Sequence, residues 1–348
     1  MRMRTIQALA ATAGLSLVAA LVALAVRPDS PAPQPPTETR LFPALATRAN
    51  DVADIRVVQG GETATLVRFG DRWVLAEKGG FPAHLDRIRD VVAGLAALSL
   101  AEPRTDQPDR HARLDLDDPE RPGARGRLLE IRTAQGDLLA RLVVGRAAAA
   151  PVSPGRPAIY VRRVEDNRTW LADGPLDLPR TPVDWLDRRL ADFGPDHVRA
   201  LVWTAPGRPP LALARTAPGS FEFQAEVDGQ SRRTDPAGGQ ALARLLSGLA
   251  FDDVRPADEV RFDGAAVADV QTFDGLRIRF ELADADGATW ARIAAGVAPV
   301  RVGSIPVTTI GAMAAAFTER AQGWAFRLPP ARTDILRNPA RLLSSPRS

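Results

Sequence analysis

An acidic segment at residues 106–120, DQPDRHARLDLDDPE, holds the residue types best suited to chemistry in this chain. Asp115, Asp117 and Asp118 could supply the oxygen ligands that Ca²⁺ prefers. The segment lacks the D-x-[DN]-x-[DN]-G run and the terminal Glu of an EF-hand-like loop. Aspartates ahead of a proline such as Pro119 are also typical of a surface turn, where carboxylates accept backbone amides. The spacing favours the turn, and these three aspartates are the only metal candidates that we retain.

Other side chains that commonly catalyse reactions are few and scattered. His84, His111 and His197 are the three histidines, and no two of them have metal-ligand spacing. The sequence has no cysteine, no G-x-S-x-G elbow and no Walker or G-x-G-x-x-G loop. Lys78 lies beside Gly79 in a turn, where we expect it to be solvated. We therefore expect no catalytic residue, no cofactor and no enzyme activity. Paired carboxylates for glycoside hydrolysis stay open, because the fold sets their ~5–9 Å spacing.

Six tryptophans could either form a platform for stacking sugars or pack inside the fold. Most of them fall within expected strands or near helix starts, which favours packing in the core. They are Trp73, Trp170, Trp185, Trp203, Trp290 and Trp324.

The elements that position these residues are strands and helices in alternation. Apolar and polar residues alternate over 51–59, 63–69 and 72–77, which predicts three strands with a tight turn at Gly70. Pro82 is suited to the first position of a helix, and apolar residues follow at helical spacing. The predicted buried stripe of that helix is Ile88, Val91, Val92, Leu95 and Leu98.

An antiparallel meander is predicted next, in GRLLEIRTAQGDLLARLVVG, AIYVRR and TWLADG, followed by a short helix in TPVDWLDRRLADF. The layout then recurs. A strand, turn and strand from His197 correspond to those from Asp51, GGQALARLLSGLAFDDVRPA corresponds to the helix, and VQTFDGLRIRFEL to the meander. We predict an α+β fold: two tandem repeats of β-hairpin, helix and antiparallel β-meander, after one N-terminal transmembrane helix.

The N-terminus predicts a membrane anchor. About 22 uncharged residues follow Arg2 and Arg4, which suffices to cross a bilayer with the N-terminus in the cytoplasm. A cleaved signal peptide is the alternative, because residues 23–25 fit an A-x-A site, but the apolar run exceeds the usual signal core. A proline-rich linker then acts as a semi-rigid spacer. The expected parts are a cytoplasmic region 1–4, an anchor 5–26, a linker 27–40, a first unit 41–192, a second unit 193–329 and an Arg-rich tail 330–348.

The charge pattern argues against nucleic-acid binding. The net charge is +3, and the high isoelectric point of about 10.2 reflects arginines that cannot be titrated near neutral pH. These arginines alternate with acids, as in RRVEDNR and LDRIRD, which is typical of a solvated surface. Nucleic-acid recognition would instead gather basic and aromatic residues on one face.

Taken in order, several segments resemble the bacterial family described as domain of unknown function 4340. They are LFPALATRANDVADIRV, RFGDRWVLAE, LDLDDPE, YVRR with TWLADG, WLDRRLADF and GWAFRLP. The resemblance implies a single-span protein with an extracytoplasmic domain in the inner membrane of a bacterium. Some members are encoded beside ABC-exporter components of the gliding-motility type. No catalytic residue of the family is established, so none is carried over.

Together these observations predict a non-enzymatic accessory or scaffold protein that is anchored in the inner membrane, has its C-terminal domain in the periplasm, and works with an ABC-type exporter. The alternative is an extracytoplasmic binding module that takes a glycan, lipid or peptide in a groove between the repeats. A hydrolase that uses carboxylates is the third hypothesis.

Overall fold

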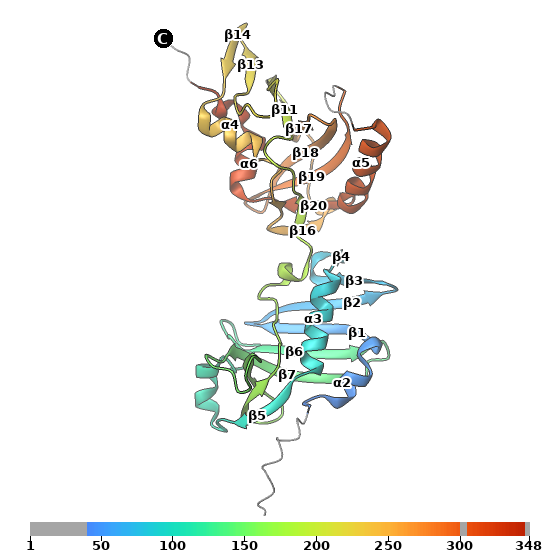
Figure 1. Ribbon diagram of the computed structural model, residues 1–348, viewed down its shortest axis with the longest axis vertical. Helices are drawn as coiled ribbons and strands as arrows, with labels where there is room; N and C mark the ends of the chain where they lie inside the picture. Colours follow the sequence, from blue (N-terminus) through green and yellow to red (C-terminus); the bar gives the residue numbers. More distant parts are fainter. Residues whose placement is uncertain (1–39, 300–304, 345–348) are drawn as a thin grey trace, which may run out of the picture.

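The computed structural model describes residues 40–299 and 305–344, which form two stacked units along the long axis of the molecule (Figure 1). The predicted cytoplasmic region and anchor, and nearly all of the linker, lie outside these residues. Within them, no helix is both long and apolar enough to cross a membrane.

The first unit is built on one antiparallel sheet, sheet 1, with the strand order β4-β3-β2-β1-β6-β7-β8-β9-β5. Its strands are β1 (Val52–Gln59), β2 (Glu62–Phe69), β3 (Arg72–Leu75), β4 (Phe81–Pro82), β5 (Ser99–Pro103), β6 (Arg127–Thr133), β7 (Leu138–Ala147), β8 (Ala158–Arg162) and β9 (Thr169–Asp173). The predicted hairpin around Gly70 and the predicted meander are both confirmed.

Helix α3 (Leu85–Ala96) crosses one face of sheet 1, and the short α2 (Pro43–Thr47) lies beside it (Figure 1). Four residues of the predicted stripe face the sheet from α3, and Leu98 is buried just beyond its end. The predicted start at Pro82 is wrong, because Phe81 and Pro82 pair with β3 as an edge strand. Short 3-10 helices complete the unit, at Ala49–Asp51, Ala76–Lys78, Pro108–Leu114 and Pro182–Trp185.

The second unit is built on another antiparallel sheet, sheet 2, with the order β14-β13-β12-β11-β17-β18-β19-β20-β16. Its strands are β11 (Val198–Ala205), β12 (Arg208–Ala214), β13 (Gln224–Val227), β14 (Gln230–Arg233), β16 (Asp253–Pro256), β17 (Ala266–Thr272), β18 (Leu276–Ala285), β19 (Ala288–Val297) and β20 (Trp324–Arg327). Its helices are α4 (Pro236–Ala243), α5 (Val307–Ala321), α6 (Pro330–Arg337) and 3-10 turns at Ala257–Glu259 and Pro339–Leu342. The fold is therefore α+β, as predicted.

Two expectations about the chain between and after the sheets are corrected. The predicted helix in TPVDWLDRRLADF is only the 3-10 turn at 182–185, after which β10 (Arg189–Ala191) pairs with β15 (Leu249–Ala250). The segment 330–348, expected to be a tail, folds against sheet 2 as far as Ser344. Its α6 buries Ile335 and Leu336 against the sheet.

An aromatic junction joins the two units where edge strand β4 meets β16 and β20. The Phe81 ring packs edge-on against Trp324, Phe251 and Phe326, with ring centroids 4.9, 5.5 and 6.0 Å away. The Nζ of Lys78 lies 2.6 Å from Asp253 Oδ1, so the expectation that this lysine is solvated is wrong. Buried residues of both sheets form one continuous hydrophobic cluster. The junction therefore couples the units as one packed body.

Candidate functional site

The aspartates of the acidic segment hold a loop together. Asp117 accepts hydrogen bonds from the backbone N of Gly126 at 2.8 Å and of Arg125 at 3.2 Å. Asp118 accepts one from the backbone N of Glu120, and Asp115 lies 3.1 Å from the Arg125 guanidinium. These contacts are those of the turn that the sequence favours. Within the described ranges, no group of three or more His, Cys, Asp or Glu side chains is placed to hold a metal ion.

Asp115 also adopts the backbone conformation that its type permits. Its φ of 54° is left-handed, as are those of Asp228 and Asp286 in hairpin turns. Aspartate tolerates this region because its short side chain can hydrogen-bond locally. The turn at Asp286 joins β18 to β19, and the two strands pair across it.

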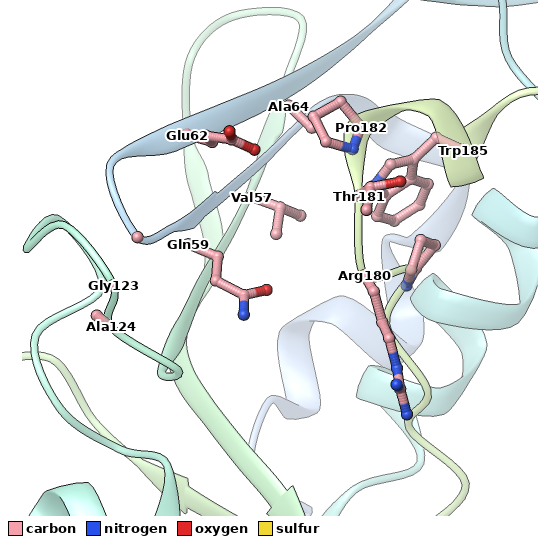
Figure 2. A pocket seen from close by; sticks show the side chains of 12 residues that line it. Val57, Gln59, Glu62, Ala64, Gly123, Ala124, Arg180, Thr181, Pro182 and Trp185 are labelled. Atoms are coloured by element: carbon pink, nitrogen blue, oxygen red, sulfur yellow. The ribbon is translucent and has the colours of Figure 1, made fainter. Parts of the chain in front are cut away.

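The held loop forms one wall of a cavity of about 290 Å³ (Figure 2). Gly123 and Ala124 line that wall, and the turn of the β1–β2 hairpin packs against it through Gly60. The third wall is the segment 179–185, which follows β9 and ends on the buried ring of Trp185. Three segments that are far apart in sequence therefore enclose the cavity.

The cavity has an apolar floor and a polar rim. Val57, Ala64 and Trp185 are buried and make the floor. Glu62 and Arg180 lie on the rim, and neither side chain has a hydrogen bond or ion pair with any other residue that the structure describes. In Figure 2, Glu62 extends from the β1–β2 hairpin and Arg180 from the segment on the opposite side. One free carboxylate and one free guanidinium suit a small group that carries both charges.

The histidines stand apart from this cavity and from one another. His111 is buried, and its Nε2 donates to the Asn167 carbonyl at 2.8 Å. His84 is the N-cap residue of α3, and His197 Nδ1 lies 3.2 Å from the Gly194 carbonyl oxygen. His84 Nδ1 is buried without a hydrogen-bond partner among the described residues.

The tryptophans pack as the sequence favoured. Four of the six are buried, and Trp170 and Trp324 are half-buried against the core. A row of exposed rings for stacking sugars is therefore absent from the described part of the chain.

Perturbed ionisable groups lie in the sheets and loops. Burial raises the pKa of Asp54 above its ordinary 3.8, and nearby Glu130 acts in the same direction while Arg132 opposes both. Burial lowers the pKa of Arg127, whose Nη1 donates to the Leu178 carbonyl at 2.9 Å. That bond fastens the segment behind the cavity to β6, so this arginine has a structural role.

The sequence did not single out the cavity residues. Glu62 lies more than a hundred residues before the segment that holds Arg180 and Trp185, and no local motif connects them. The register of the hairpin and the path of the chain after β9 bring them together. Glu62 is a single charged residue at the end of a hairpin, and Arg180 precedes a Thr-Pro turn. Both patterns are common on protein surfaces, so neither predicts a site.

The fold and the cavity define an α+β protein of two nine-stranded antiparallel sheets with a pocket of mixed polarity. The chain belongs to the family described as "Domain of unknown function (DUF4340)", whose profile matches residues 73–269. The match runs from β3 through the junction and into β17, so it covers parts of both units. Curated proteins gave no match to the chain.

Proposed function

We propose that this protein is a non-enzymatic accessory protein that holds two sheet units as one rigid body beside an ABC-type exporter. In this proposal residues 5–26 anchor it in the inner membrane, and the folded part is in the periplasm. The exporter comes from the resemblance to a family in which some members are encoded beside exporter components. The observation that carries the scaffold role is the aromatic junction, because a hinge between binding domains would lack such packing.

The junction combines apolar packing with ion pairs from both units. Phe81 is 3% exposed and contacts three aromatic rings of the second unit. Lys78 and Arg188 reach across to Asp253 and Asp252, at 2.6 and 3.2 Å. Burial of one Phe side chain contributes about 1.5–3 kcal/mol, and each aromatic pair adds about 0.5–1.5 kcal/mol. Such a contact supports a fixed relative orientation, which a brace for a membrane partner requires.

The proposal includes an internal duplication, in which the two units are tandem copies. The two sheets have the same strand order when β1 is matched with β11 and β6 with β17. Both also carry an acid–arginine pair at the same register position. Glu130 lies opposite Arg141 in sheet 1 at 2.7 Å, and Asp269 lies opposite Arg279 in sheet 2 at 2.9 Å.

Two finer features of these strands also correspond. The register of β1 with β6 shifts just after Val52, and that of β11 with β17 shifts just after Val198. The hydroxyl of Thr133 accepts a hydrogen bond from the backbone N four residues on, and Thr272 does the same in the second unit. Bulges and turns of this kind are specific local features, so their recurrence supports two copies of one unit.

The test is in-cell chemical cross-linking of the tagged full-length protein, followed by mass spectrometry of what is extracted with it. We expect exporter subunits with the wild type and with Gly70→Ala, and fewer with Gly79→Ala, which disturbs the junction. Recovery of no exporter subunit with the wild type would remove the proposed role. Equal recovery with all three proteins would show that a rigid junction is not needed for it.

A further inference from the structure

A groove of about 590 Å³ lies between the two units, on the face of sheet 1 opposite to α3. One bank is the β2–β4 edge of sheet 1, with Phe69 and Val74. The other bank is the second half of α5 with Trp324 behind it. The volume is in the range of pockets that bind ligands.

Large apolar side chains are exposed to solvent in the groove and beside it. The Phe69 side chain is 68% exposed, the highest value among the large apolar residues that the structure describes. Met313, which is 41% exposed, lies one turn before Ala316 on the α5 bank. No charged residue occurs in α5 before Glu319. An apolar strip therefore continues from the groove along α5, which is typical of an interaction surface.

The charged residues of the groove identify the occupant. The side chains of Arg72 on one bank and Glu319 on the other form no hydrogen bond or ion pair within residues 40–299 and 305–344. Arg320 is already held by Asp187 at 3.1 Å. The groove thus offers an apolar floor between one free cation and one free anion.

We propose that this groove binds a short peptide segment of a partner protein, with apolar side chains between an acidic and a basic residue. An anionic lipid headgroup would meet Glu319 as well as Arg72. A glycan would present many hydroxyl groups to a lining that has only these two free charged side chains. Pairing as an added strand is disfavoured because Pro82 in edge strand β4 has no N–H to donate. Recognition therefore depends on side-chain contacts. This proposal rests on the proposed scaffold role and deepens it by naming the surface that contacts the partner.

The experiment selects peptides from a phage-displayed library of random 12-residue sequences, on the full-length protein in phosphatidylcholine nanodiscs. Enriched sequences should combine apolar residues with one acidic and one basic residue. Phe69→Ser should weaken their binding roughly ten- to hundredfold, the effect of leaving one aromatic side chain unburied. Leu138→Ser is the matched control, because Leu138 is also exposed, at 50%, but does not line the groove. Arg72→Glu should shift the enriched sequences away from acidic residues.

Three results would overturn the inference. The first is that no sequence is enriched, and the second is that enriched peptides bind Phe69→Ser as tightly as the wild type. The third is binding to phosphatidylglycerol vesicles that Phe69→Ser abolishes and Leu138→Ser preserves, which would assign the groove to lipid. The inference and the proposed function can also fail separately. If Phe69→Ser loses peptide binding but cross-linking recovers no exporter subunit, the groove is upheld as a peptide site and the exporter is removed as the partner.

Discussion

Replacing Gly79 by alanine tests whether the junction is rigid. Gly79 has a φ of +65°, and a Cβ built there would lie 2.5 Å from Pro256 Cγ and 2.8 Å from Pro256 Cδ across the junction. A proline ring in a paired strand cannot rotate away from this contact. Gly70 is a matched control, because its φ is +59° and nothing lies within 4 Å of the same added atom.

The expected magnitudes separate the two substitutions. The left-handed conformation costs an alanine about 1–2 kcal/mol, and this applies to both positions. Overpacking against a fixed ring costs a further 1–3 kcal/mol, roughly, and applies only at Gly79. We therefore expect Gly79→Ala to lower the free energy of unfolding by about 2–5 kcal/mol and Gly70→Ala by about 1–2 kcal/mol. Urea unfolding followed by tryptophan fluorescence measures both values.

A second assay reports on the junction directly. Lys78 is the only lysine of the chain, and its side chain is 22% exposed beside Asp253. Amine acylation followed by peptide mass spectrometry therefore measures access to one junction atom. We expect slow labelling of Lys78 in the wild type and in Gly70→Ala, and faster labelling in Gly79→Ala. Equal destabilisation by both substitutions, with equal labelling rates, would refute the rigid junction.

Three further predictions concern the fold and the loop. Arg215 is 3% exposed, and its guanidinium donates to four backbone carbonyls. Arg215→Met should therefore lower the free energy of unfolding in urea by at least about 3 kcal/mol. Arg208→Met, at an exposed position, is the control and should change it little. The raised pKa of Asp54 means that its ionisation opposes folding above about pH 4. Asp54→Asn should therefore unfold at a higher temperature than the wild type at pH 7, and at the same temperature near pH 3; a gain that persists at pH 3 would exclude this cause. Asp117→Ala should lower stability by about 1–2 kcal/mol equally with Ca²⁺ and with EDTA, and a wild-type melting temperature that rises with Ca²⁺ would restore the metal hypothesis.

Local patterns predicted the elements whose stability is local. The hairpin around Gly70 and the stripe of α3 follow from residue alternation and helical spacing, and both are confirmed. The segment 181–193 failed as a helix because its second half pairs with β15, about 60 residues later. A pairing across that distance leaves no mark in the periodicity of the segment itself.

The sites depended on still longer-range contacts. Lys78 has the pattern of a solvated turn residue, and only the docking of the second unit supplies its partner Asp253. Phe69 could have been noticed, because strict alternation puts it on the face of β2 opposite to Leu66. An aromatic residue on the solvent side of a hairpin is a usable signal. The bank formed by α5 could not be inferred, since it lies nearly 250 residues further along the chain.

The outer edges of the two described nine-stranded sheets differ from the edge that meets the junction. At the junction β4 presents Phe81, whereas β14, in the same place in sheet 2, presents Arg232 and Arg233. Ser344 covers that edge as well, because its backbone N donates to the Arg233 carbonyl and its own carbonyl accepts from Arg232. At the opposite end, β5 finishes on Pro103. Charge, proline and a covering segment therefore disfavour the pairing of another strand at these two outer edges.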